Sequence, residues 1–168
     1  EGKLHHLTLR GQQVQLAAPY VIQGDMTVEG KAVIEINQQV AGDLRLPPEG
    51  QLSSLGRHTL TIAGDARLEG GFEGNALPYP NITDFPINSL NLNFIGTEDA
   101  VLHVSDTAVF NLIIINKEAA TVHFSADAPA LARLNAIRVG NSFPQFRLQS
   151  GTLRLTSNID IPSLTAGG

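Results

Sequence analysis

The sequence of 168 residues contains no cysteine and no tryptophan, and it has only two tyrosines. The absence of cysteine excludes disulfide scaffolds, thiolate metal sites and cysteine nucleophiles. Long hydrophobic runs are also missing, since the densest one, at residues 112–115, is far shorter than the roughly 20 residues that cross a bilayer. The sequence therefore predicts no membrane insertion and no disulfide-stabilised domain.

Basic residues are outnumbered, with 11 Lys and Arg against 16 Asp and Glu, for a formal net charge of −5. This balance argues against binding to nucleic acid or to an anionic membrane surface. The length predicts one domain over residues 1–168, because domains typically hold about 100–200 residues. No signal peptide is recognisable at residues 1–3, so we expect either a cytoplasmic chain or a processed piece of an exported one.

Alternation of apolar and polar residues with a period of two is the dominant pattern. Examples are Leu7-Thr8-Leu9, Leu44-Arg45-Leu46 and Leu153-Arg154-Leu155. Such alternation is typical of strands with one buried face and one wet face. The 16 glycines and nine prolines between these short segments indicate many turns. We therefore expect an all-β protein.

A Gly-Asp pair precedes three of the alternating segments, at Asp25, Asp43 and Asp65. The pairs recur about every 20 residues, a period that suits one coil of a parallel β-helix. We predict a right-handed, single-stranded parallel β-helix, or solenoid, of about seven to eight coils stacked at about 4.8 Å. Neither end resembles a solenoid cap, so we expect the chain to be a segment of a longer chain or assembly.

The repeat breaks at residues 70–89, which are rich in glycine and proline. Proline cannot donate to a strand ladder, so we predict one protruding, proline-rich loop there. Phe72, Tyr79 and Phe85 would place aromatic rings on this loop. We therefore predict that these three residues bind a ligand.

Stacked coils align equivalent residues in columns, which creates two further candidate sites. Asp25, Asp43 and Asp65 would form either a column of calcium ligands or three separate Asx turns. Arg45 and Arg67 would align on the outer surface, where guanidinium groups can hold a sugar carboxylate. Neighbouring acidic side chains could instead neutralise this pair. We expect no other metal and no cofactor.

The second half of the chain carries a recognisable repeat grammar. Residues 110–116 read Phe-Asn-Leu-Ile-Ile-Ile-Asn, and residues 148–155 read Leu-Gln-Ser-Gly-Thr-Leu-Arg-Leu. These segments resemble repeat regions of large secreted surface proteins of the Bacteroidetes type. The resemblance implies a parallel β-helix in an adhesin or cell-surface fibre, with an extracellular location. Asp106-Thr107-Ala108 is similar to the O-glycosylation acceptor of such organisms, which makes Thr107 a candidate glycosylation site.

The Gly-Asp coils of the first half are also similar to bactofilins, which are cytoskeletal β-helices that polymerise end to end. This second resemblance implies a cytoplasmic filament. Bactofilin coils are more regular and lack a loop like the one expected here.

From these features we predict a non-enzymatic extracellular module: a stalk, an adhesin segment or a fibre subunit. Its expected partners are copies of itself or adjacent modules, together with glycans or a cell surface. Two alternatives stay open. One is a carbohydrate-binding or carbohydrate-active β-helix of the lyase or hydrolase kind, since such enzymes share this architecture. The other is a bactofilin-like filament.

Overall fold

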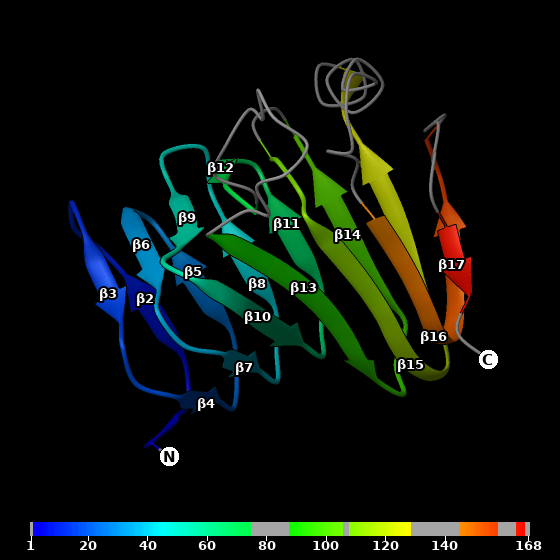
Figure 1. The fold of residues 1–168 in the computed structure, drawn as a ribbon, viewed down its shortest axis with the longest axis horizontal. Coiled ribbons are helices and arrows are strands. Elements are labelled where there is room, and N and C mark those ends of the chain that lie inside the picture. The colour runs from blue at the N-terminus through cyan, green and yellow to red at the C-terminus, as the bar shows by residue number, and fades with distance from the viewer. Residues whose placement is uncertain (1, 75–87, 106–107, 129–144, 158–163, 167–168) are drawn as a thin grey trace.

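A computed structural model describes residues 2–74, 88–105, 108–128, 145–157 and 164–166 of the chain. The fold is all-β, as the alternating pattern predicts. No helix in these described ranges is long and apolar enough to cross a membrane. The strands follow one another along the long axis of the molecule (Figure 1).

The strands are short at first and longer towards the C-terminal end. Their bounds are β1 (Gly2–Leu4), β2 (Leu7–Leu9), β3 (Val14–Leu16), β4 (Tyr20–Ile22), β5 (Met26–Val28), β6 (Lys31–Ile34), β7 (Gln38–Val40), β8 (Leu44–Leu46), β9 (Gln51–Ser54), β10 (Arg57–Ile62), β11 (Ala66–Leu68), β12 (Gly71–Phe72), β13 (Ser89–Gly96), β14 (Ala100–Val104), β15 (Leu112–Ala126), β16 (Gln145–Leu155) and β17 (Leu164–Ala166).

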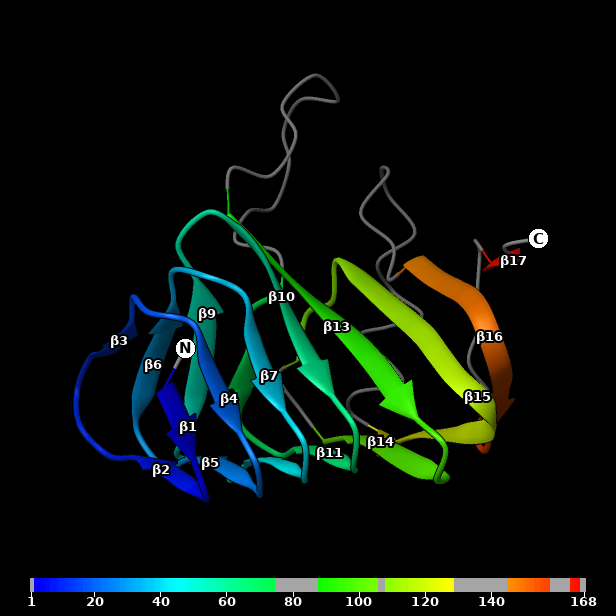
Figure 2. The ribbon, with the colours of Figure 1, turned by 90° about the horizontal axis from the view of Figure 1, so that it is seen from below.

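Every pairing between these strands is parallel, and the strands form three walls. Wall 1 contains β2, β5, β8, β11 and β14, wall 2 contains β3, β6, β9 and β12, and wall 3 contains β1, β4, β7, β10 and β13. We call one passage of the chain through the walls a rung. Figure 2 shows the walls from a second direction. Parallel strands stacked in rungs confirm a solenoid-like architecture.

Strand β15 joins two of the walls into one sheet. Its first part pairs with β13 of wall 3, and its last part pairs with β14 of wall 1. The strand turns the corner near Ala119, a non-glycine residue with a positive φ of 55°. The sheet therefore runs from wall 3 into wall 1 without a break and is nearly closed.

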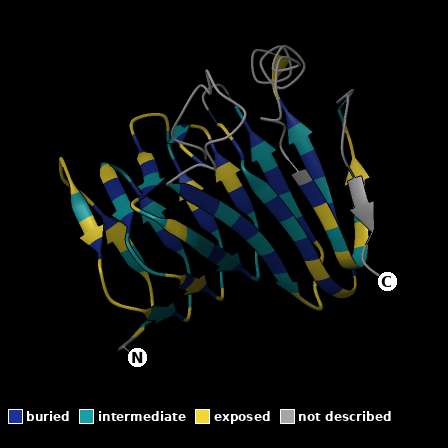
Figure 3. Cartoon of the chain, viewed as in Figure 1, coloured by how far each residue is buried: buried dark blue, intermediate teal, exposed yellow. Residues whose placement is uncertain are grey.

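The alternating residues divide between the interior and the surface as the sequence predicts (Figure 3). In wall 1 the register places Leu44, Ala66, Leu102 and Phe124 on successive rungs, and all four are buried. Stacking of similar side chains from rung to rung fills one continuous core. Each fully buried large apolar side chain contributes about 1.5–3 kcal/mol to stability.

The glycine of each Gly-Asp pair is required by a close approach between rungs. The N–H of Gly42 donates to the carbonyl of Gly24 over 3.0 Å, and the N–H of Gly64 donates to the carbonyl of Gly42 over 3.1 Å. A Cβ at Gly42 would lie only 2.7 Å from the carbonyl carbon of Gly24. Only glycine fits this corner, which explains its recurrence before the wall 1 strands.

Two expectations about the loop at residues 70–89 change in the structure. Gly71 and Phe72 form β12 and pair with β9, and Ser89 already belongs to β13. The inserted segment therefore begins after residue 72 and ends before residue 89. Its proline-rich part, residues 75–87, lies outside the described residues.

Candidate functional site

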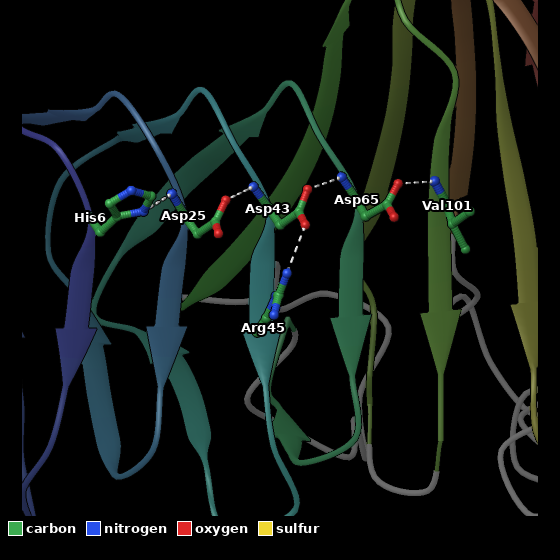
Figure 4. A network of polar contacts seen from close by, with 6 residues as sticks. All are labelled: His6, Asp25, Asp43, Arg45, Asp65 and Val101. Atoms are coloured by element: carbon green, nitrogen blue, oxygen red, sulfur yellow. Dashed lines mark hydrogen bonds and ion pairs between the residues drawn. The ribbon is translucent and has the colours of Figure 1, made fainter.

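The aspartates of the Gly-Asp pairs form a chain of hydrogen bonds along wall 1 (Figure 4). Asp25 Oδ1 accepts the N–H of Asp43 over 3.0 Å, and Asp43 Oδ1 accepts the N–H of Asp65 over 3.0 Å. Asp65 Oδ1 accepts the N–H of Val101 over 2.8 Å, and at the first rung His6 Nδ1 accepts the N–H of Asp25. We call these residues the aspartate ladder.

The aspartate ladder differs from both uses that the sequence predicts for these residues. Each carboxylate bonds a backbone N–H of the next rung, 18 to 36 residues further along the chain, so the turns are not separate units. No group of three His, Cys, Asp or Glu side chains that could hold a metal ion occurs in the described part of the chain. The geometry assigns the ladder to rung-to-rung attachment.

Removing one ladder carboxylate tests this assignment. Asp43→Ala is expected to lower the free energy of unfolding by about 1–3 kcal/mol, because a hydrogen bond to a charged acceptor is lost and the N–H of Asp65 is left without it. Asp43→Asn keeps an acceptor oxygen, so its loss in the free energy of unfolding should be smaller. Urea unfolding at neutral pH measures both. Equal stability of Asp43→Ala and the parent protein would contradict the assignment.

A second column of side chains lies on the outer surface of wall 1, beside the ladder. Thr27 pairs in register with Arg45, Arg45 with Arg67, and Arg67 with His103. The alignment of Arg45 and Arg67 is thus as the repeat predicts. Both side chains are exposed to solvent.

Thr27, Arg45 and Arg67 border a groove of about 530 Å³ that crosses β5, β8 and β11. The corner after β8 forms part of its lining. The groove is lined by Thr27, Glu29, Asp43, Arg45, Leu46, Pro47, Glu49, Arg67 and Glu69. The size falls within the range of about 300–1,000 Å³ that is usual for small-molecule sites.

The groove has an acidic excess, with four carboxylates against two guanidinium groups. Arg45 Nη2 lies 3.2 Å from Asp43 Oδ2, and Arg10, outside the groove, pairs with Glu29. This pairing holds the pKa of Glu29 below its usual value and raises the pKa of Arg10. Arg67 has no ion pair or side-chain hydrogen bond with any described residue, so its guanidinium group is available to a ligand.

A polar cluster continues the same surface beyond the groove. His103 Nδ1 lies 2.9 Å from Ser125 Oγ, and His103 Nε2 lies 3.7 Å from Asp127 Oδ2. Ser105 Oγ donates to the same carboxylate over 3.1 Å. This order of groups resembles a nucleophile, a base and an acid, but His103 and Ser125 are register partners in paired strands. The cluster links neighbouring rungs through side chains.

The structure separates the predicted site residues into four groups. Arg45 and Arg67 meet in the groove, and the three aspartates form the ladder. Phe72 is a correction, because it is fully buried in β12 and packs against Phe110 instead of standing on a loop. The remaining predicted site residues lie outside the described residues: Tyr79, Phe85 and Thr107.

Sequence reasoning missed two parts of the site. Pro47 and Glu49 line the groove from the corner after β8, and only knowledge of where that corner points would have placed them there. His6 and Asp99 extend the ladder pattern, since Asp99 Oδ1 accepts the N–H of Thr121 over 2.7 Å. Their position just before an alternating strand was the available signal.

Comparison with known proteins finds no matching protein family, no similar curated protein and no similar solved structure.

Proposed function

We propose that the protein is a non-enzymatic structural module of an extracellular stalk, fibre or adhesin, built as a right-handed parallel β-helix of seven to eight coils. The observation that carries this proposal is the aspartate ladder, which ties successive rungs together through side chains as well as through strand pairing. Such double attachment favours a stiff rod over a flexible domain.

No described strand pairs with the outer edge of the first rung, which supports assembly with an adjacent module or a second copy. Strands β1, β2 and β3 each stand at the end of the strand order in their sheets. Leu4, Leu7 and Val14 are only partly buried there. Unpaired strand edges are templates for pairing with another strand, and an added rung would complete the burial of these side chains.

A proline in β2 tests the assembly. Leu7 donates its N–H to Asp25, and Leu9 accepts the N–H of Glu29, so the backbone groups of Thr8 face the free edge. We expect the purified protein to form elongated particles that associate end to end as concentration rises, and Thr8→Pro to abolish association without changing thermal stability. Electron microscopy shows the shape of the particles, and sedimentation equilibrium measures their association.

Thr8→Ala is the matched control, because it keeps the N–H and should associate like the parent protein. Compact particles, or association that persists in Thr8→Pro, would overturn the proposed assembly. Labelling of the protein on intact cells and in permeabilised cells distinguishes the extracellular module from the bactofilin-like filament. Labelling of intact cells supports the extracellular module, whereas labelling only after permeabilisation supports the bactofilin-like filament.

A further inference from the structure

We propose that the groove on wall 1 binds a linear, uncharged polysaccharide that lies across the strands, parallel to the stack of rungs. This inference goes beyond the structural role proposed above and does not depend on self-association. It concerns the surface over β5, β8 and β11, where the column of Thr27, Arg45 and Arg67 runs from rung to rung.

The first argument is the match between a repeating surface and a repeating ligand. Arg45 and Arg67 occupy the same position on the adjacent strands β8 and β11. Two residues beyond this column, Glu29 and Glu69 also occupy equivalent positions, after β5 and β11, and β8 lies between these two strands. Adjacent strands are spaced by about 4.8 Å, which is close to the advance per ring of an extended pyranose chain. Three strands would therefore face about three successive sugar rings.

The second argument is the hydrogen-bonding chemistry of the groove. Each guanidinium group presents a fork of N–H donors, and each carboxylate presents acceptor oxygens. Neighbouring hydroxyls of a sugar ring both donate and accept, so they can pair with both kinds of group at once. Arg67, which has no side-chain partner among the described residues, and the exposed Glu69 stand two residues apart on the same surface.

The third argument is charge, which decides between ligand classes. Four carboxylates and two guanidinium groups line the groove. A polyanion would meet repulsion from the acidic side chains, including Asp25 and Asp65 of the adjacent ladder. A cationic peptide would meet Arg45 and Arg67 at the centre of the groove. An uncharged chain avoids both penalties, and the partly exposed Pro47 offers an apolar surface for the carbon–hydrogen face of a ring.

The experiment is isothermal titration of the purified protein with cellohexaose, mannohexaose, xylohexaose and chitohexaose, alongside an oligogalacturonate and an oligolysine. We expect at least one of the four uncharged chains to bind with an affinity that barely changes with salt, because no net charge is neutralised. Arg67→Gln should weaken that binding about tenfold or more, since a hydrogen bond from a charged donor is lost.

Arg147→Gln is the matched control, because Arg147 is an exposed arginine of β16 that pairs with Ile114 in the part of β15 belonging to wall 3. It should bind like the parent protein. The proposal is overturned if none of the four uncharged chains binds. It is equally overturned if Arg67→Gln and Arg147→Gln bind alike, or if the oligogalacturonate or the oligolysine is preferred with a strongly salt-dependent affinity. Thermal melts establish that both variants are folded.

Discussion

Replacing Phe72 with alanine is expected to lower the free energy of unfolding by about 3–5 kcal/mol, the usual loss for a phenylalanine removed from a packed core. Phe72 is fully buried, and its ring centroid lies 5.4 Å from that of Phe110 at an interplanar angle of 31°. Removing the ring from among its packed neighbours would leave a cavity in the core. Urea unfolding with an unchanged slope measures the loss.

The same variant separates two interpretations of this residue. If Phe72 contacted a ligand from an exposed loop, as its glycine-rich surroundings predict, alanine would weaken binding and leave unfolding almost unchanged. Leu55→Ala is the control, since Leu55 is 57% exposed and its loss should stay within about 0.5 kcal/mol. A similar small effect of Phe72→Ala would contradict its place in the core.

The parallel stack could be predicted from the sequence because two local signals agree. Period-two alternation separates inward from outward residues in each strand, and the Gly-Asp pairs mark where wall 1 begins on three rungs. In Leu44-Arg45-Leu46, both leucines are buried and Arg45 is exposed. The alignment of Arg45 with Arg67 follows directly from this repeat.

The use of the aspartates could not be predicted, because it depends on contacts between rungs. An Asx turn needs only the aspartate and its chain neighbours, whereas Asp43 Oδ1 accepts an N–H that is 22 residues away. The sequence places the carboxylate at a corner but does not say which amide faces it. The corner glycines, which allow rungs to approach closely, make that long-range bond available.

The prediction that Phe72 stands on a loop is wrong, because a glycine in a solenoid can mark either a loop or a close approach between rungs. The sequence predicts a loop at Gly70 and Gly71, but a Cβ at Gly70 would lie 3.1 Å from the carbonyl carbon of Gly50 on the preceding rung and closer still to backbone oxygens. This glycine allows a close approach between rungs, like Gly42. Gly71 and Phe72 therefore belong to a strand of wall 2 and not to a loop.

Replacing Lys117 is the second change for which we expect a large loss in the free energy of unfolding. It is a fully buried lysine whose Nζ donates to the carbonyl of Ala63 over 2.8 Å and to that of Glu98 over 2.7 Å. Lys117→Ala is expected to lower the free energy of unfolding by about 2–4 kcal/mol, because each of the two carbonyls loses its donor. The variant no longer has a desolvated ammonium group, and this relief offsets only part of the loss. Lys117→Met keeps an apolar side chain of similar length in the core, so its loss in the free energy of unfolding should be smaller.

The pH dependence of stability distinguishes the buried cation from a simple packing role. Burial lowers the pKa of Lys117, and the nearby Asp99, Asp65 and Glu98 carboxylates oppose this shift only in part. Between the lowered pKa and the ordinary value of 10.5, the unfolded chain binds more protons at this lysine than the folded chain does. Stability due to Lys117 must therefore rise with pH across this interval.

Urea unfolding of the parent protein and Lys117→Met, repeated from neutral pH to about 10.5, measures this difference. The parent protein should gain stability relative to the variant as pH rises, because groups titrating in both proteins cancel in the comparison. A flat difference would mean that Lys117 is solvated as an ordinary surface lysine, and a falling one would mean that its charged form is favoured by folding. Either result would contradict a desolvated ammonium group bound between the carbonyls of two rungs.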